Sequence, residues 1–234
     1  MWVVLVIAIG IVALAHTMPA PFVLDALAGD RAVWHMPRSD PPTVYLTYDD
    51  GPNPSTTPDV LDVLAREGVH ATFFIIDRHL TDETSPIVRR MFAEGHAVGL
   101  HSANKSFMLK PASELSRTLL AAADRIETLA GSPPCPAFRP RGGWRSQAMF
   151  DGLEAIDYKL VGFGWMLWDV ELFRARDGDR TVGRIVPRAR AGDIIVMHDG
   201  DDAAPRKDQR ATVSATARLI PALRARGFGF GIVC

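Results

Sequence analysis

Two periods of apolar and polar positions alternate along most of the chain. Short runs of β-branched and aromatic residues are typical of buried parallel strands, and the segments between them carry apolar residues at helical spacing. The runs predict strands at 43–47, 71–76, 97–100, 137–140, 160–168, 194–197 and 229–233. The intervening segments predict helices near 57–67, 86–94, 113–130, 147–156, 181–191 and 212–226. About seven strands alternating with helices indicate an α/β fold with a mostly parallel sheet.

Polar, chemically capable side chains follow these strands directly. They are Asp49, Asp50, His101, Arg139, Asp169 and His198. In a parallel βα barrel the carboxyl ends of all strands open on one face, which carries the active site. An open doubly wound sheet has a similar crevice, so periodicity leaves both architectures open. Either architecture would bring these distant residues together.

This set of residues suits acid–base hydrolysis near a divalent ion. Asp49 and Asp50 are adjacent at a strand end and should point to different sides. One can then ligate a metal while the other removes a proton from water. His101 and His198 can each serve as metal ligand, acid or base, and Arg139 can orient a carboxylate. Each residue alone has an ordinary structural explanation, but together they favour a catalytic site.

Composition and charge exclude several classes of protein. The chain has 234 residues, of which 47% are hydrophobic and 23% charged, which argues against disorder and against a polytopic membrane protein. The net charge is -1, whereas a nucleic-acid-binding domain typically carries an excess of basic residues. Arginines at 184–190 and 218–226 fall at helical spacing, which a solvated helix face explains better than a polyanion site. The oligomeric state is not specified.

The N-terminus differs from the rest, because residues 1–15 are uncharged and almost all apolar. A helix of that length rises about 22 Å, so it would have to extend to about residue 24 to span a membrane. We expect residues 1–24 to be a signal peptide or membrane anchor, with a buried helix as the alternative. Residues 25–42 then form a linker, and 43–234 the domain, acting outside the cytoplasmic membrane. Cys135 and Cys234 could pair there.

Five motifs, in order, resemble those of the NodB-homology polysaccharide deacetylases (carbohydrate esterase family 4). Thr47-Tyr48-Asp49-Asp50-Gly51-Pro52 resembles the family's Thr-Phe-Asp-Asp-Gly-Pro. The others are Ala71-Thr72-Phe73-Phe74, Gly95-His96-Ala97-Val98-Gly99-Leu100-His101-Ser102, Phe138-Arg139-Pro140 and Ile195-Val196-Met197-His198-Asp199. The resemblance covers residues 43–233 and implies a distorted or incomplete parallel (β/α) barrel. It also implies a divalent metal, often zinc, and hydrolysis of N-acetyl groups on chitin-like or peptidoglycan glycans.

The resemblance also implies roles for individual residues. Asp49 would be the catalytic base, with Arg139 orienting it, and His198 would be the general acid. Asp50 and His101 would be metal ligands.

Two further groups are assigned less directly. Asp169 and Glu171 are both candidates for the carboxylate that orients His198, because the family's Asp-Trp motif has no clean match here. Trp144, Trp165 and Trp168 could form a flat apolar surface for a sugar ring, or could simply pack in the core.

One position departs from the family. The family reads His-Ser/Thr-x-x-His, but here His101-Ser102-Ala103-Asn104-Lys105 places lysine at the second histidine. An ammonium group has no lone pair for a metal. Asp50 and His101 alone fall below the three protein ligands of a typical catalytic zinc. We therefore expect zinc to bind weakly or not at all, with Lys105 paired to Asp50 or close to substrate.

The leading hypothesis is a hydrolase that removes N-acyl groups, in the first place N-acetyl, from amino sugars of a cell-surface or secreted polysaccharide. A deformylase or deacylase of a lipid-linked sugar is one alternative and would suit a membrane anchor. A carbohydrate-binding pseudoenzyme that has lost its metal site is the other, and Lys105 motivates it.

Overall fold

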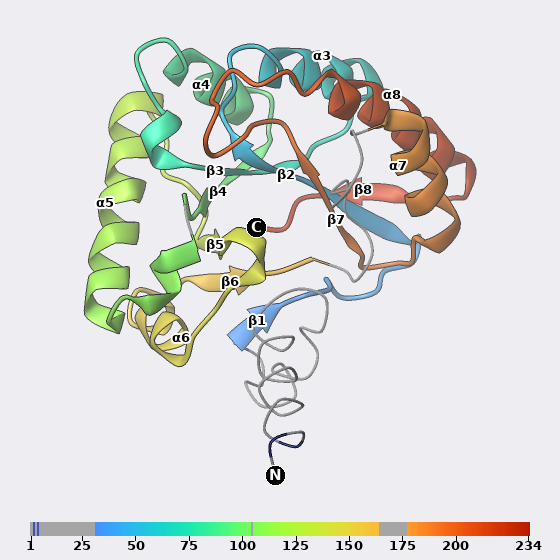
Figure 1. The fold of residues 1–234 in the computed structure, drawn as a ribbon. Helices are drawn as coiled ribbons and strands as arrows, with labels where there is room; N and C mark the ends of the chain where they lie inside the picture. Colours follow the sequence, from blue (N-terminus) through green and yellow to red (C-terminus); the bar gives the residue numbers. More distant parts are fainter. Residues whose placement is uncertain (1, 3, 5–30, 104, 164–176) are drawn as a thin grey trace.

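The computed structural model describes residues 2, 4, 31–103, 105–163 and 177–234 (Figure 1). Within them, one eight-stranded sheet has the order β1-β6-β5-β4-β3-β2-β7, with β8 also paired to β2. Every strand pair is parallel. The strands are β1 (Ala32–Val33), β2 (Thr43–Gly51), β3 (Thr72–Ile75), β4 (Ala97–His101), β5 (Ala137–Arg139), β6 (Lys159–Val161), β7 (Ile194–His198) and β8 (Gly229–Gly231).

Helices cover the outer face of the curved sheet, as Figure 1 shows. They are α3 (Thr57–Glu67), α4 (Ser85–Ala93), α5 (Ala112–Ala130), α6 (Gln147–Glu154), α7 (Gly178–Ile185) and α8 (Arg210–Ala225). Short 3₁₀ turns join them: η2 (Asp77–His79), η3 (Lys105–Leu109), η4 (Arg141–Gly143) and η5 (Val186–Arg188). The predicted incomplete parallel βα barrel is therefore confirmed.

Alternation along the strands builds two separate cores. Val44, Leu46 and Tyr48 of β2 belong to the large cluster between sheet and helices. Tyr45 packs against a second, smaller cluster inside the curve of the sheet, which includes Phe74, Ile194 and Val233. Successive residues of a strand face opposite sides, so odd-numbered positions of β2 face the interior of the barrel.

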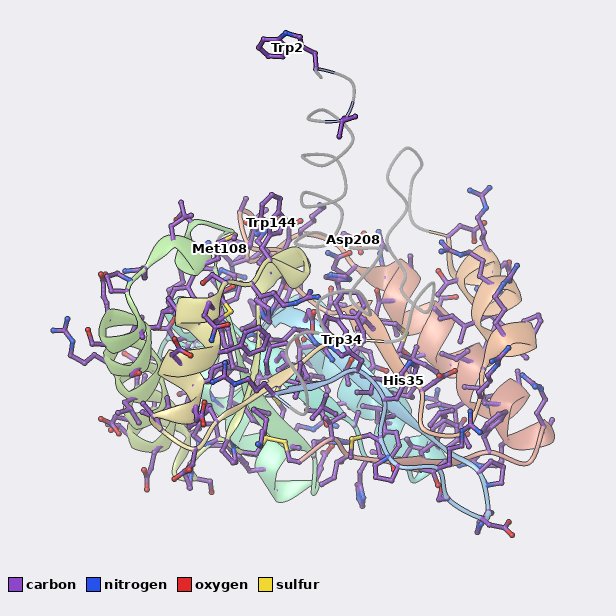
Figure 2. The ribbon with its side chains drawn as sticks, turned by 90° about the horizontal axis from the view of Figure 1, so that it is seen from below. Trp2, Trp34, His35, Met108, Trp144 and Asp208 are labelled. Atoms are coloured by element: carbon purple, nitrogen blue, oxygen red, sulfur yellow. A yellow bond between two sulfur atoms is a disulfide. The ribbon has the colours of Figure 1, made fainter. Side chains whose placement is uncertain are left out.

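The segment between 31 and 36 is part of the barrel, although the sequence assigned it to a linker. β1 pairs with β6, and the following chain crosses to the opposite edge of the sheet, where Met36 N–H donates to Gly192 O at 2.8 Å. Trp34 is 8% exposed and lies so close to Gly162 that a Cβ there would be 1.9 Å from its ring. In the view of Figure 2, Trp34 lies over the middle of the domain.

The seven predicted strands and the six predicted helices all have counterparts, with bounds that differ by a few residues. Strand β6 ends at Val161, and the predicted strand beyond residue 163 lies outside the described residues. The signal or anchor segment, 1–24, also lies almost wholly outside them. No helix among the described residues is long and apolar enough to cross a membrane.

The structure also describes the two cysteines and the arginine-rich helix face. Cys135 and Cys234 form a disulfide, with 6.0 Å between their Cα atoms. The arginine-rich helix face carries ion pairs, with Arg218 bonded to Asp179 and Arg224 Nη1 3.1 Å from Glu67 Oε2. This pairing agrees with a solvated face.

Candidate active site

Asp49 and Arg139 form a buried ion pair at the carboxyl ends of β2 and β5. Arg139 Nη1 donates to Asp49 Oδ1 at 2.6 Å, and Asp49 is 3% and Arg139 0% exposed. β2 places Asp49 on the interior side, in line with Tyr45 and Thr47. Arg139 was expected to orient Asp49, and the structure brings the two together as that role requires.

The Arg139 guanidinium is held on several sides, which explains how a charge can stay buried. Nη1 also donates to Thr47 Oγ1 at 2.8 Å, and Nη2 donates to Gly162 O at 3.0 Å. Its Cζ lies 4.0 Å from the centre of the Phe74 ring, a distance at which a cation–π interaction is attractive. Burial lowers the pKa of Arg139, while Asp49 raises it. A fixed guanidinium leaves the Asp49 carboxylate little freedom to turn.

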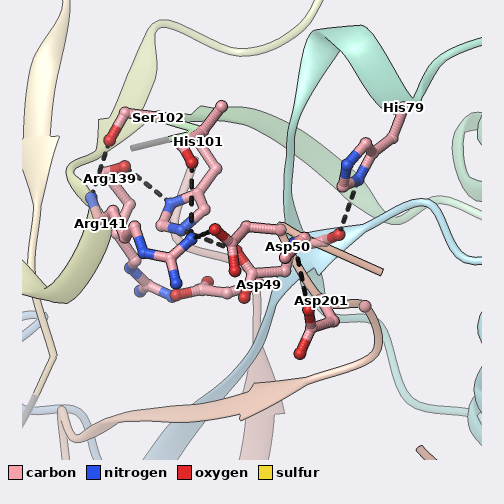
Figure 3. A network of polar contacts seen from close by, with 12 residues as sticks. Asp49, Asp50, His79, His101, Ser102, Arg139, Arg141 and Asp201 are labelled. Atoms are coloured by element: carbon pink, nitrogen blue, oxygen red, sulfur yellow. Dashed lines mark hydrogen bonds and ion pairs between the residues drawn. The ribbon is translucent and has the colours of Figure 1, made fainter. Parts of the chain in front are cut away.

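Asp50 and His101 form a second pair beside the first (Figure 3). His101 Nε2 lies 3.2 Å from Asp50 Oδ1, and His101 Nδ1 donates to Arg139 O at 2.8 Å. Burial would raise the pKa of Asp50, but the hydrogen bond and charge of His101, with the charges of His198 and Arg141, hold it below its ordinary value. The two carboxylates were expected to point to different sides. Instead, both carboxylates lie in one network, where Asp49 pairs with Arg139 and Asp50 pairs with His101.

The pair fits two positions of a metal site. His101 Nδ1 carries a hydrogen because it donates to Arg139 O, so in a neutral His101 the lone pair of Nε2 would face Asp50 Oδ1, 3.2 Å away. Two lone pairs this close repel unless a proton or a cation lies between them. Within the described residues, however, no group of three His, Cys, Asp or Glu side chains converges on one point. These donors alone fall short of a catalytic zinc site.

Lys105 begins η3, four residues after His101, but its side chain is outside what the structure describes. Its expected pairing with Asp50 or substrate stays a prediction.

His198 ends β7 and lies beside Asp49 in the register of the sheet. It is half-buried, and its carbonyl accepts a hydrogen bond from Thr212 Oγ1 at 2.8 Å. The next residue, Asp199, is 0% exposed and accepts a hydrogen bond from Thr57 Oγ1. Burial raises the pKa of Asp199 to about 7, against the effect of Thr57. The proposed acid and base are therefore on neighbouring strands.

Of the tryptophans and the remaining carboxylates expected at the site, only Trp144 is among the described residues. Trp144 follows η4, is half-buried and lies at the edge of the molecule in Figure 2. Trp165, Trp168, Asp169 and Glu171 all lie outside the described residues.

Sequence reasoning missed two buried residues that contact this site. His79 Nδ1 lies 3.2 Å from Asp50 O, and Asp199 packs against Gly51. Asp199 stands in a recognised motif, which could have drawn attention to it. Nothing in the local sequence singles out His79.

Comparison with known proteins finds relatives in both sequence and fold. A family model described as polysaccharide deacetylase matches residues 37–161. The peptidoglycan-N-acetylglucosamine deacetylase of Bacillus cereus is 31% identical, over 84% of this chain and 88% of its own length. A chitooligosaccharide deacetylase of Bradyrhizobium sp. is 35% identical, over 80% and 86%, respectively. A solved family 4 acetyl xylan esterase from Clostridium thermocellum, in complex with a cobalt ion, is 30% identical with a TM-score of 0.70, over 82% and 88%.

Proposed function

Because this chain belongs to the polysaccharide deacetylase family, we propose that it hydrolyses N-acetyl groups on the amino sugars of peptidoglycan or chitin-like oligomers. The observation that carries the proposal is the buried Asp49–Arg139 pair beside Asp50 and His101 at the strand ends. The names of the two deacetylase relatives support amino-sugar substrates of this kind.

In the proposed reaction Asp49 removes a proton from water, which attacks the acetyl carbon. Arg139 bonds to Oδ1 and so fixes the direction of the carboxylate. The resulting tetrahedral species collapses as the bond from carbon to nitrogen breaks. His198, from the neighbouring strand, protonates the departing amine. The products are acetate and a free amino sugar.

A divalent metal would be held by Asp50 and His101, and it would polarise the acetyl carbonyl. Cobalt in the family 4 esterase supports metal use in this family. Asp50 and His101 are the two protein ligands that the described residues would supply to the metal.

The proposed location is outside the cytoplasmic membrane, with the chain tethered there if residues 1–24 are retained. The uncharged N-terminal residues support it. So does the Cys135–Cys234 disulfide, because disulfides persist mainly in oxidising compartments. Membrane fractionation with N-terminal sequencing tests this. A cytoplasmic protein that retains Met1 and has two free thiols would contradict it.

Acetate release from N-acetylated chito-oligomers and from peptidoglycan tests the activity, with Asp49→Asn as the matched control. We expect release by the wild type and a loss of at least about 100-fold in the variant, because the base is gone. If both proteins are silent with several acyl sugars and added metals, the enzyme proposal fails. Binding of the oligomers without release would then favour the pseudoenzyme that Lys105 suggests.

A further inference from the structure

The end of β2 is irregular in a way that shapes the site. Tyr48 faces the helices and Asp49 faces the barrel interior, so a regular strand would turn Asp50 back toward the helices. Instead, the pairing of β2 with β3 shifts register between Asp49 and Gly51, and Asp50 has a φ of 68°. A residue with a side chain rarely adopts this left-handed conformation. This β-bulge at Asp50 turns its carboxylate toward His101 in the site.

The bulge also removes one carbonyl from the pairing of the strands. Asp49 O accepts from Gly200 N at 3.3 Å, and Gly51 O accepts from Ile76 N at 2.9 Å. Both flanking carbonyls thus bond to the backbone. The carbonyl of Asp50, between them, is met by a side chain: His79 Nδ1 lies 3.2 Å from it.

The buried His79 side chain makes this one hydrogen bond among the described residues. It ends η2 (Asp77–His79) and is 5% exposed, while its carbonyl accepts from Thr84 Oγ1 at 2.6 Å. A carbonyl only accepts, so Nδ1 must carry the hydrogen. His79 Nε2 is buried and has no hydrogen-bond partner in the part of the chain that is described. In Figure 3 the ring lies across Asp50 from His101.

A second contact limits the movement of the same carbonyl. Gly200 packs so tightly against it that an added Cβ would lie 2.0 Å from Asp50 O. The carbonyl of Asp50 therefore lies between the His79 donor and the backbone of Gly200. The direction of this carbonyl sets the direction of the Asp50 side chain.

We propose that His79 is a positioning residue for Asp50. By donating Nδ1–H to the Asp50 carbonyl, His79 stabilises the bulge that brings the second carboxylate to the site. This inference rests on the proposed function for its effect on catalysis, but its structural part does not depend on that function.

The test compares two polar substitutions in the full chain. His79→Asn keeps an amide nitrogen near the place of Nδ1, whereas His79→Gln moves it to the place of Nε2, away from the carbonyl. His96→Gln is the control, because His96 is also 5% exposed but bonds to Ala71 N, at the opposite end of the strands. Crystal structures of the wild type and both His79 variants are combined with steady-state deacetylation of N-acetylated chito-oligomers.

We expect His79→Gln to lower kcat by up to about 100-fold, because a displacement of about 1 Å at a reacting centre can have that effect. KM should stay within about twofold, because substrate contacts are unchanged. His79→Asn should retain most of kcat, and His96→Gln nearly all of it. In the crystals, Asp50 should leave its left-handed conformation in the Gln variant only.

The proposal is overturned if Asp50 keeps its place in His79→Gln. It is also overturned if the Asn and Gln variants lose kcat equally, or if His96→Gln loses as much as His79→Gln. If the wild type releases no acetate, the proposed function fails, and the position of Asp50 in the three crystal structures still decides the role of His79.

Discussion

Substituting Arg139 by methionine should damage stability and catalysis together. Methionine keeps most of the side-chain length but removes the charge and every guanidinium hydrogen bond. Asp49, 3% exposed, would then be a buried carboxylate without its cation, and Gly162 O would lose its donor. Removing one partner of a buried ion pair costs roughly 3–5 kcal/mol. For a chain of this size, the expected fall in Tm is about 6–20 °C.

The activity should fall through kcat, because Asp49 would lose the contact that fixes its direction. Thermal unfolding and the steady-state rate of acetate release measure the two effects.

The double variant Asp49→Asn/Arg139→Met separates the explanations. It buries no unpaired charge, so it should be more stable than Arg139→Met alone even though it is inactive. A Tm of Arg139→Met within about 2 °C of the wild type would refute the reasoning. A double variant no more stable than Arg139→Met would refute it as well.

Three further predictions concern metal, pH and the disulfide. Lys105→His should tighten zinc binding at least about tenfold in calorimetry, because it supplies a third ligand beside Asp50 and His101; one tightly held zinc in the wild type, with no gain in the variant, would contradict this. Burial raises the pKa of Asp199 from 3.8 to about 7, so the folded protein keeps a proton that the unfolded chain loses, and stability should fall as pH rises from about 4 to about 7. Urea unfolding of Asp199→Asn should show a smaller fall over that range, and an unchanged slope would count against the buried carboxyl. Cys234→Ser opens a link between residues 99 apart, which should cost up to about 4.7 kcal/mol; equal unfolding midpoints for variant and wild type would show that the link adds nothing.

Much of the fold could be predicted because its signals are local. Apolar runs and helical spacing mark each long element, and polar residues directly after the strands mark the functional face. The meeting of Asp49 with Arg139, and of Asp50 with His101, follows from parallel strands sharing one edge.

The features that were missed depend on tertiary contacts. Strand β1 has only 2 residues, too few for a period to show, and its burial depends on Trp34 meeting Gly162. The bulge at Asp50 gives no local sign, because a positive φ is uncommon for any residue other than glycine. His79 bonds to a backbone carbonyl 29 residues away, and a backbone partner leaves no trace in the sequence.

The burial of Trp34 matters for any shortened form of this protein. A protein beginning at Thr43, where the first long strand starts, would appear from the sequence to contain the whole domain. It would lack β1, so the backbone groups of β6 that pair with Ala32 and Val33 would face solvent as an open edge. Such edges recruit strands from other molecules. The loss would also remove Trp34 from Phe163, whose ring it meets edge-on with centroids 6.4 Å apart and whose ring lies 5.6 Å from the Arg139 guanidinium. Starting the protein upstream of Ala32 should therefore favour a monodisperse product and preserve the support beneath the ion pair.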